Sequence, residues 1–413
     1  MATLPRTRDR SREFDIVLWG ATGFTGRLVA DYLVRKYLGG ESGLRLALAG
    51  RNREKLEGIA NELGAPQLPI LVGDSFDAES LNAIASKAEV LITTVGPYAK
   101  YGAEVVAACV RNGTDYCDLT GETHFIRAMI DAHEEEAKTT GARIVHCCGY
   151  DSIPSDLGTL MVQEAFKERH GRYASEVKMA AVQMRGAPSG GTIASMLNMV
   201  DEMKENPGLR KILGNPYALN PKGVRGPDKR DQTGARFDRD LDMWTGTFVM
   251  AAINTRIVRR SHALMGLPWG EGFRYSEVMG TGKGAKGWSR AASLTVGVIA
   301  LMGSLALPLT RPFVEKRLPS PGEGPDQEAR EKGSFKTLFV ALGDGGVERA
   351  IVADRRDPGY GSTAVMLSEA AICLALEGAQ LECGGGILTP ATAMGMRLVE
   401  RLRAAGMTFE VQG

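Results

Sequence analysis

The sequence is poor in the residues that build metal centres and disulfide frameworks. Its 413 residues include only six Cys and five His. The cysteines show no CxxC spacing, and the histidines form no HExxH pair. Because zinc sites and disulfide scaffolds need clustered ligands or regular cysteine spacing, we predict neither of them. The adjacent Cys147 and Cys148 are interpreted as small buried residues.

An excess of either charge is also absent. Lys and Arg number 50 and Asp and Glu number 49, which gives a formal net charge of +1. Such a chain has no overall attraction to nucleic acid or to anionic lipid. The opening residues, MATLPRTRDRSR, contain no apolar run, so no secretory signal is predicted. We expect a cytoplasmic protein of two or more domains, since this length can bury a large core.

A strand, a glycine turn and a helix are predicted near the N-terminus. Phe14–Leu18 is a short apolar run typical of a buried strand, and three spaced glycines separate it from an amphipathic helical pattern. Glycines at such spacing permit the turn, the approach of a phosphate and close packing of helix on strand. The N–H groups of the first helical turn then face an anion. A purely structural turn is the alternative. The predicted cofactor contacts here are Gly20, Thr22, Gly23, Phe24, Thr25 and Gly26.

The next predicted strand, Leu44–Asn52, indicates which dinucleotide binds. It ends in Arg51 and Asn52, without the Asp or Glu that binds the ribose of NAD. A guanidinium at this position pairs with the 2′-phosphate of NADP, so NADP(H) is the predicted cofactor. The alternative is a solvated loop arginine. Later strand ends add Asp74 and Ser75 beside the adenine, and then Thr94, Val95, Gly96 and Pro97.

Six predicted strands alternate with helical segments until Ser155. This alternation predicts an α/β fold with a Rossmann-type, doubly wound parallel sheet. After Ser155 the rhythm stops and the composition becomes more mixed. We therefore predict a dinucleotide-binding domain (1–155), an inserted α+β substrate and dimerisation domain (156–353) and a C-terminal segment (354–413) that returns to the first domain.

Two segments of the second domain have open interpretations. Ala291–Leu309 is uncharged and approaches the ~20 apolar residues that cross a bilayer. A buried or subunit-interface helix is favoured over contact with a membrane surface, and a true span is the least favoured. The three arginines of NTRIVRRSH either bind the phosphates of a carrier protein or CoA, or lie on a solvated strand face. They are Arg256, Arg259 and Arg260.

The sequence resembles the saccharopine dehydrogenase-like oxidoreductases and, among them, the trans-acting enoyl reductases of actinobacterial lipid synthesis. The resemblance extends over nearly the whole chain. It is carried by DIVLWGATGFTGRL, LALAGRN, TTVGPYAKYG, GTDYCDLTGE, GYDSIPSDLG, NTRIVRRSHAL, FRYSE and GGGILTPATAMG.

This resemblance implies a doubly wound nucleotide-binding domain that the C-terminus completes, with an inserted β-sheet substrate domain. It also implies NADPH-dependent reduction of a carbon–carbon double bond in a polyketide or fatty acyl intermediate, in trans with a lipid synthase. The acyl chain would be borne by a carrier protein or CoA, and a homodimer and peripheral membrane contact are further expectations. The alternatives are a C–N dehydrogenase of saccharopine or opine type and a non-catalytic, lipid-associated NADP(H)-binding protein.

Proton donors are sought at the ends of the fourth and sixth predicted strands. Enoyl reduction needs a hydride at the β-carbon and a proton at the α-carbon. The phenols of Tyr98 and Tyr150 can donate to a developing enolate. Asp151 would orient a partner unless burial raises its pKa. Alternatively, both aromatic rings only form the wall of the pocket.

Overall fold

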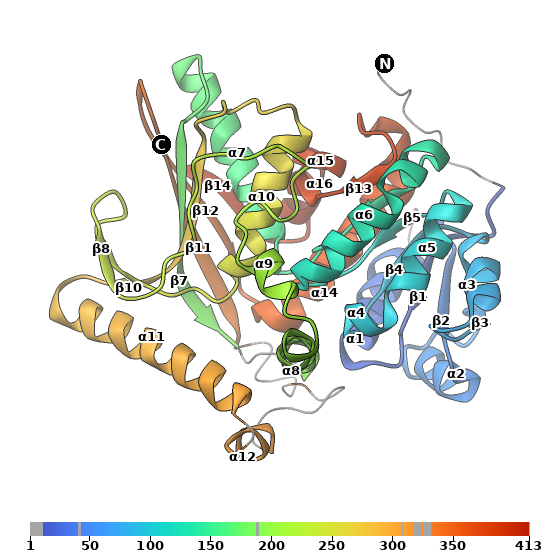
Figure 1. Cartoon of the computed structure of the whole chain (residues 1–413). Helices are drawn as coiled ribbons and strands as arrows, with labels where there is room; N and C mark the ends of the chain where they lie inside the picture. Colours follow the sequence, from blue (N-terminus) through green and yellow to red (C-terminus); the bar gives the residue numbers. More distant parts are fainter. Residues whose placement is uncertain are drawn as a thin grey trace. The chain divides into compact units, whose positions relative to one another are not determined.

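The computed structural model describes residues 11–39, 43–186, 190–307, 309–316, 324 and 332–412 (Figure 1). These residues form two compact units. Unit 1 contains the described residues up to Ile153, Gly324 and Gly359–Ala405, and unit 2 contains the remainder.

The sheet of unit 1 is parallel throughout and has the order β13-β6-β5-β4-β1-β2-β3. The chain runs outward from β1 to β3 and then crosses back to place β4 on the other side of β1. This reversal makes a doubly wound sheet, so the predicted α/β, Rossmann-type fold is confirmed. The strands are β1 (Phe14–Trp19), β2 (Leu46–Gly50), β3 (Ile70–Val72), β4 (Ala88–Thr93), β5 (Asp115–Cys117), β6 (Arg143–Val145) and β13 (Gly386–Leu388).

Every residue of β1, β2 and β4 is buried. Strands that are buried along their whole length are expected where helices cover both faces of a parallel sheet. The helices of this unit are α1 (Phe24–Leu33), η1 (Val34–Leu38), α2 (Arg53–Glu62), α3 (Ala78–Ala85), α4 (Tyr98–Tyr101), α5 (Ala103–Asn112), α6 (Thr123–Thr140), η2 (Pro358–Ser362, its first residue assigned to unit 2), α14 (Thr363–Glu377), η3 (Gly378–Gln380), α15 (Pro390–Ala393) and α16 (Gly395–Ala404).

A buried carboxylate fastens the C-terminal helices of unit 1 to its N-terminal ones. Glu369, on α14, accepts hydrogen bonds from Tyr37 Oη at 2.6 Å, Lys36 Nζ at 2.8 Å and Arg401 Nε at 2.9 Å. These partners hold the pKa of Glu369 below its usual value, although burial opposes that shift. The carboxylate therefore joins α14 to η1 and α16.

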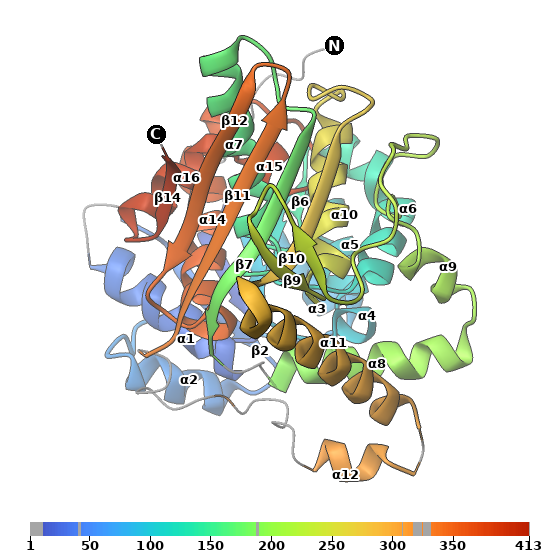
Figure 2. The same cartoon turned by 90° about the vertical axis from the view of Figure 1, so that its left-hand side faces the viewer.

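Unit 2 is built on a mixed sheet of order β14-β12-β11-β7-β10-β9-β8, shown broadside in Figure 2. Only β7 and β10 pair in parallel; the other pairs are antiparallel. The strands are β7 (Glu176–Arg185), β8 (Arg236–Asp238), β9 (Met243–Gly246), β10 (Arg274–Gly282), β11 (Ser334–Gly343), β12 (Gly346–Asp354) and β14 (Thr408–Gln412). The helices are α7 (Ile153–His170), α8 (Gly190–Glu205), α9 (Leu209–Leu213), α10 (Ala251–Leu264), α11 (Gly284–Ala306) and α12 (Arg311–Glu315).

The division of the chain differs from the predicted segments at the C-terminus. The first division, after Ile153, lies close to the predicted boundary at 155. Within the predicted returning segment, 354–413, residues Gly359–Ala405 belong to unit 1. Strand β14 instead pairs with β12, from Arg349↔Gln412 to Ala353↔Thr408, and completes the edge of the second sheet.

The interpretation of Ala291–Leu309 as a helix buried within the chain is wrong. The segment forms most of α11, but only 17% of the Gly284–Leu305 window is buried. Glycine allows close packing on one side, since a β-carbon at Gly246 of β9 would lie 3.3 Å from Ala291 Cα. The rest of the helix surface is uncovered by the described part of unit 2.

Candidate functional site

The glycine turn after β1 leaves no room for side chains where backbone segments meet. Gly20 has a φ of +93°, and a β-carbon there would lie 2.5 Å from Val95 Cγ2. A β-carbon on Gly26 would lie 2.1 Å from the carbonyl oxygen of Gly20. At Gly23 the nearest atom would be 3.4 Å away, an ordinary contact. Gly20 and Gly26 therefore permit the turn and the close packing of α1 against it. The β-carbon position of Gly23 is not crowded by neighbouring atoms.

The helix that follows the turn begins without a side-chain cap. Gly23 is the N-cap residue of α1, and glycine has no side chain that could accept a hydrogen bond from the N–H groups of the first turn. Thr22, Phe24 and Thr25 surround this end, and the Phe24 ring lies edge-on to Tyr360 with centroids 4.6 Å apart. Uncapped N–H groups at a helix N-terminus bind phosphate, as the predicted pyrophosphate site requires.

The two residues after β2 have different roles in the structure. Asn52 caps α2, because its side chain accepts a hydrogen bond from Lys55 N at 2.9 Å. Arg51 is exposed and forms no ion pair with the described residues. The guanidinium of Arg51 is therefore available for a phosphate.

The loop after β3 contains an aromatic residue that the sequence analysis missed. Asp74 accepts a hydrogen bond from Phe76 N at 2.9 Å, and Ser75 is buried. This turn leaves Phe76 66% exposed, with its ring 5.6 Å from the ring of Tyr101. An exposed aromatic at the predicted adenine end could stack on a base. The position of Phe76 directly after Asp74 and Ser75, just beyond the end of β3, could have identified it from the sequence.

The ends of β1 and β4 lie side by side at the point where the strand order reverses. Thr94 N donates to Trp19 O at 3.1 Å, and Thr94 Oγ1 donates to Gly20 O at 3.2 Å. Val95 N bonds Thr93 Oγ1, and Gly96 and Pro97 lead into α4. Ligands of doubly wound sheets bind at this crevice. The predicted contacts from the first and fourth strands therefore meet there.

Tyr98 is held inside the protein by its own hydrogen bonds. Its hydroxyl donates to Thr93 O at 3.2 Å, and its backbone N–H donates to the buried carboxylate of Glu122. Burial raises the pKa of Tyr98 well above its usual value. This arrangement favours a structural role at the end of β4 over proton donation.

Tyr150 and Asp151 follow β6. The backbone N–H of Tyr150 bonds Thr363 Oγ1 at 3.1 Å, and its ring is largely buried. Asp151 is half-buried, and its carboxyl accepts no hydrogen bond from the described residues. Burial raises its pKa from 3.8 to about 7. The sequence analysis allows Asp151 to donate a proton only if burial raises its pKa, and the structure meets that condition.

A buried aspartate that the sequence analysis did not select holds the loop after β6. The carboxylate of Asp118 accepts hydrogen bonds from Cys147 N at 3.1 Å and Tyr116 Oη at 2.9 Å, and it lies 2.7 Å from His146 Nδ1. It joins the end of β5 to the end of β6. Because Tyr150 and Asp151 come directly after this anchor, we assign Asp118 a positioning role.

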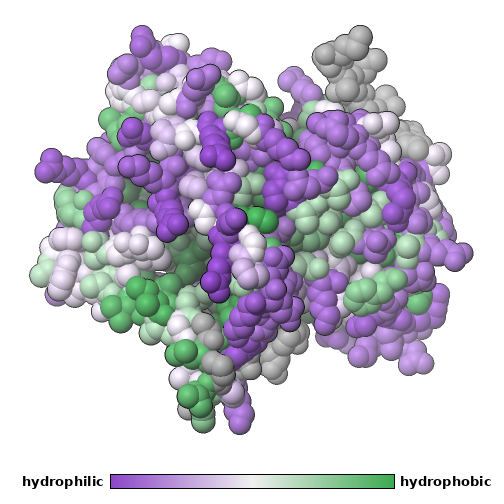
Figure 3. All heavy atoms as spheres, viewed as in Figure 1, coloured by the Kyte–Doolittle hydropathy of each residue, from purple (hydrophilic) through white to green (hydrophobic). Residues whose placement is uncertain are grey.

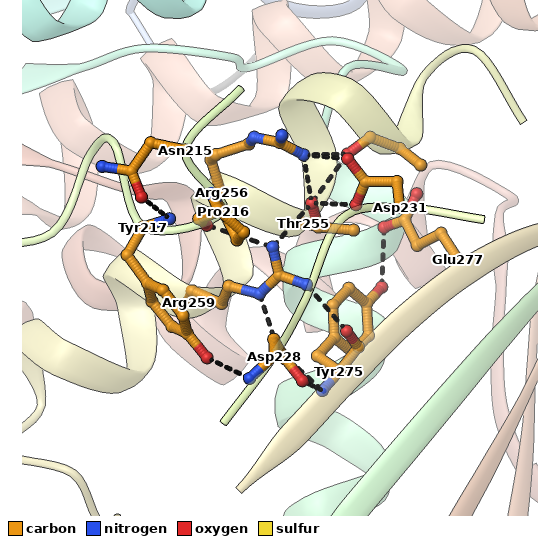
Figure 4. Close-up of polar contacts among 11 residues, drawn as sticks. Asn215, Pro216, Tyr217, Asp228, Asp231, Thr255, Arg256, Arg259, Tyr275 and Glu277 are labelled. Carbon is orange, nitrogen blue, oxygen red and sulfur yellow. Dashed lines mark hydrogen bonds and ion pairs between the residues drawn. The ribbon is translucent and has the colours of Figure 1, made fainter. Parts of the chain in front are cut away.

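The three arginines of NTRIVRRSH are engaged within unit 2, and Figure 4 shows two of them, Arg256 and Arg259. They lie buried on helix α10, so the strand-face interpretation is wrong. Arg256 pairs with Asp231, and Arg259 Nε bonds Asp228 at 2.7 Å. The remaining donors largely bond carbonyl groups, including Leu213 O, Pro216 O, Tyr275 O and Leu219 O.

The phosphate-binding interpretation of these arginines is therefore wrong as well. Buried charges require partners, and Asp228 and Asp231 supply them from the polar segment that precedes β8. The network fixes that segment against α10. Within the ranges that the structure describes, no cluster of three or more His, Cys, Asp or Glu could hold a metal ion.

Replacement of Arg51 by Asp tests the predicted choice of cofactor. A charge-assisted hydrogen bond contributes about 1.5–3 kcal/mol, so the variant should bind NADPH about 10- to 150-fold more weakly. NADH binding should change little, since NADH has no 2′-phosphate. Calorimetric titration of both cofactors measures the two affinities. Unchanged NADPH affinity in Arg51→Asp would remove this residue from the site.

Comparison with known proteins agrees with the cofactor assignment. Residues 16–145 match the model of the saccharopine dehydrogenase NADP-binding domain. A trans-acting enoyl reductase of Mycobacterium tuberculosis is 40% identical, with 96% of this chain and 97% of that protein covered. One from Mycobacterium ulcerans is 37% identical with the same coverage. Saccharopine dehydrogenase (L-Glu forming) of Saccharomyces cerevisiae is similar in structure, with a TM-score of 0.49, 14% identity and coverage of 96% and 99%.

Proposed function

Because the chain belongs to the trans-acting enoyl reductases and is an NADP-dependent oxidoreductase, we propose that it reduces the carbon–carbon double bond of a lipid-like acyl thioester. The acyl group is a polyketide or fatty acyl intermediate borne by a carrier protein or CoA. Reduction in trans means that the intermediate is made by a separate synthase, which is the proposed partner.

The observation that carries the proposed chemistry is the Asp151 carboxyl. It lies one residue after Tyr150, is half-buried and has no hydrogen-bond partner among the described residues. When bound, NADPH supplies the hydride for the β-carbon. Asp151 in its protonated form donates its proton to the α-carbon of the enolate. Asp118 positions the loop that carries Asp151.

The glycine turn, the N-terminus of α1 and Arg51 would hold the pyrophosphate and 2′-phosphate. Thr94, Val95, Gly96 and Pro97 would line the nicotinamide end. Tyr150 is the second candidate donor, and Tyr98 is the weakest of the three because its hydroxyl bonds Thr93 O.

A C–N dehydrogenase of saccharopine or opine type is less well supported. Such an enzyme binds substrates with several carboxylates and needs convergent Arg or Lys side chains. The buried arginine cluster of unit 2 could have supplied them, but Arg256 and Arg259 are paired with Asp231 and Asp228.

The proposal is tested with the purified protein, NADPH and a long-chain trans-2-enoyl thioester. We expect NADPH oxidation that depends on the enoyl group, with the saturated thioester and a 2-oxo acid plus amine as negative controls. Oxidation with the oxo acid and amine alone would support the C–N alternative. NADPH binding without turnover of either substrate would support the non-catalytic alternative.

A further inference from the structure

Helices α11 and α12 carry an apolar surface that the described part of the chain leaves uncovered. Figure 2 shows α11 lying along the β9 and β10 end of the sheet in unit 2. Ala291, Thr295 and Leu305 are buried on its inner side. In Figure 3 hydrophobic side chains gather over these two helices. The large exposed apolar residues of this surface are Val296, Ile299, Leu301, Leu307, Leu309 and Phe313.

Two unpaired basic residues lie at the first end of this surface, and its second end is mixed in charge. Lys286 and Arg290 precede the apolar stretch, and Arg311 and Lys316 follow it. No Asp or Glu occurs in the sequence from 284 to 314, and Glu315 precedes Lys316 at the second end. Lys286 and Arg290 are exposed and have no ion pair with the described residues, whereas Arg311 pairs with Asp201. Trp288, also exposed, stands between the two basic residues of the first end.

We propose that the α11–α12 surface docks on an anionic lipid surface, with α11 lying in the plane of the headgroups. A partly exposed apolar helix with flanking cations and an aromatic residue at one end has the chemistry of an interfacial helix. The local charge is positive although the whole chain is nearly neutral. The helix does not span the membrane, because its inner side packs on β9 and β10 and contains buried residues.

Charge also favours a lipid surface over a parallel pairing with a second copy of the chain. If α11 paired with α11 of another molecule in parallel, Lys286 and Arg290 would face the same cations. In the antiparallel arrangement they would face Arg311 and Lys316. The parallel pairing brings unpaired cations together with no acidic residue from 284 to 314 to compensate, which disfavours it. The antiparallel pairing places them beside Glu315 and the Arg311–Asp201 pair, and measurement of the oligomeric state tests it. An anionic lipid surface complements the unpaired cations Lys286 and Arg290 at the first end.

A second membrane-length apolar helix lacks these features. The segment Pro358–Gln380 is as apolar as α11, but 83% of its window is buried within the protein. It includes α14, whose Glu369 is bonded to neighbouring helices. Its apolar character is explained by the core, whereas that of α11 is not.

Flotation of the full-length protein with vesicles tests the proposal. We expect binding to vesicles that contain phosphatidylglycerol and none to pure phosphatidylcholine. Raising the salt from about 0.15 to about 1 M shortens the Debye length from about 8 to about 3 Å and should release the protein. Lys286→Gln with Arg290→Gln should weaken binding about fivefold for each charge removed. Val296→Ser with Ile299→Ser should weaken it at least about tenfold.

Matched controls keep the result interpretable. Val249→Ser with Val347→Ser removes two other exposed valines of unit 2, and Lys211→Gln with Arg274→Gln removes two other exposed cations. Both controls should bind vesicles like the unaltered protein, and NADPH affinity reports that each variant is folded.

Three outcomes would overturn the proposal. They are absence of flotation with anionic vesicles, equal flotation of test and control variants, and a concentration-dependent dimer that Val296→Ser and Ile299→Ser abolish while vesicle binding is absent. The last outcome would assign the surface to a second copy. None of these readouts involves reduction of a substrate, so they are independent of the proposed activity.

Discussion

Asp151→Asn is expected to lower the rate of enoyl reduction at least about 100-fold, because removal of a general acid costs about 10²–10⁴ in rate. NADPH affinity should be unchanged, since the proposed cofactor contacts lie on other loops. Tyr150→Phe should have a smaller effect if the phenol only forms the wall of the pocket. The measurement is kcat with a long-chain enoyl thioester, beside cofactor titration of each variant.

The pH dependence follows from the protonation state of this carboxyl. Burial raises the pKa of Asp151 to about 7, and the protonated form is the donor. The rate of the unaltered protein should therefore be highest below pH 7 and fall as the pH rises through that value. At one pH unit above its pKa, about a tenth of the carboxyl remains protonated.

An exposed aspartate is the control. Asp344, in the turn between β11 and β12, has no ion pair with the described residues, and Asp344→Asn should leave the pH profile unchanged. If Asp151→Asn keeps full activity and the profile, Asp151 is not the donor. A large loss in Tyr150→Phe alone would then assign the proton to that phenol.

Gly26→Ala is expected to lower NADPH affinity at least about 100-fold, since displaced N–H groups lose several charge-assisted hydrogen bonds. The added β-carbon would lie 2.1 Å from the carbonyl oxygen of Gly20, so the turn or α1 must shift. Overpacking of this kind also costs about 1–3 kcal/mol of folding free energy. Thermal unfolding separates the loss of stability from the loss of binding.

Gly58→Ala is the matched control for this substitution. Gly58 lies within α2 of the same unit, and a β-carbon there would meet nothing within 4 Å. It should leave NADPH affinity unchanged and raise stability by about 0.5–1 kcal/mol, because alanine is the better helix former. Wild-type NADPH affinity in Gly26→Ala would contradict the proposed role of the turn.

The nucleotide-binding fold was predictable because its determinants are local. The apolar run Phe14–Leu18, the glycine spacing and the change from strand to helix periodicity all lie within one short segment. The alternation of strands with helices predicts the six strands β1 to β6 of the unit 1 sheet but not β13, which joins β6 from the C-terminal segment. The absence of Asp and Glu at the end of β2 indicates NADP. None of these inferences requires knowledge of a distant partner.

The errors arise where distant residues decide the structure. The phosphate-binding interpretation of Arg256 and Arg259 is wrong because their partners, Asp231 and Asp228, precede them by more than twenty positions in an irregular segment that local sequence does not connect to α10. Strand β14 joins the second sheet through pairing with β12, which its own few residues cannot indicate. Composition alone does not reveal which side of α11 is covered. Asp118 is important because of its contacts to Tyr116, His146 and Cys147, and only the fold brings all of them together.

Isotope transfer from NADPH to the acyl chain is the most direct test of the proposed reduction. The purified protein is given a trans-2-enoyl thioester with NADPH deuterated at C4, in each of the two stereochemical forms. One form should place a single deuterium on the β-carbon of the saturated product, and unlabelled NADPH in deuterated water should place one on the α-carbon. A saturated product without deuterium on the β-carbon from either form, or no saturated product at all, would contradict the proposed function.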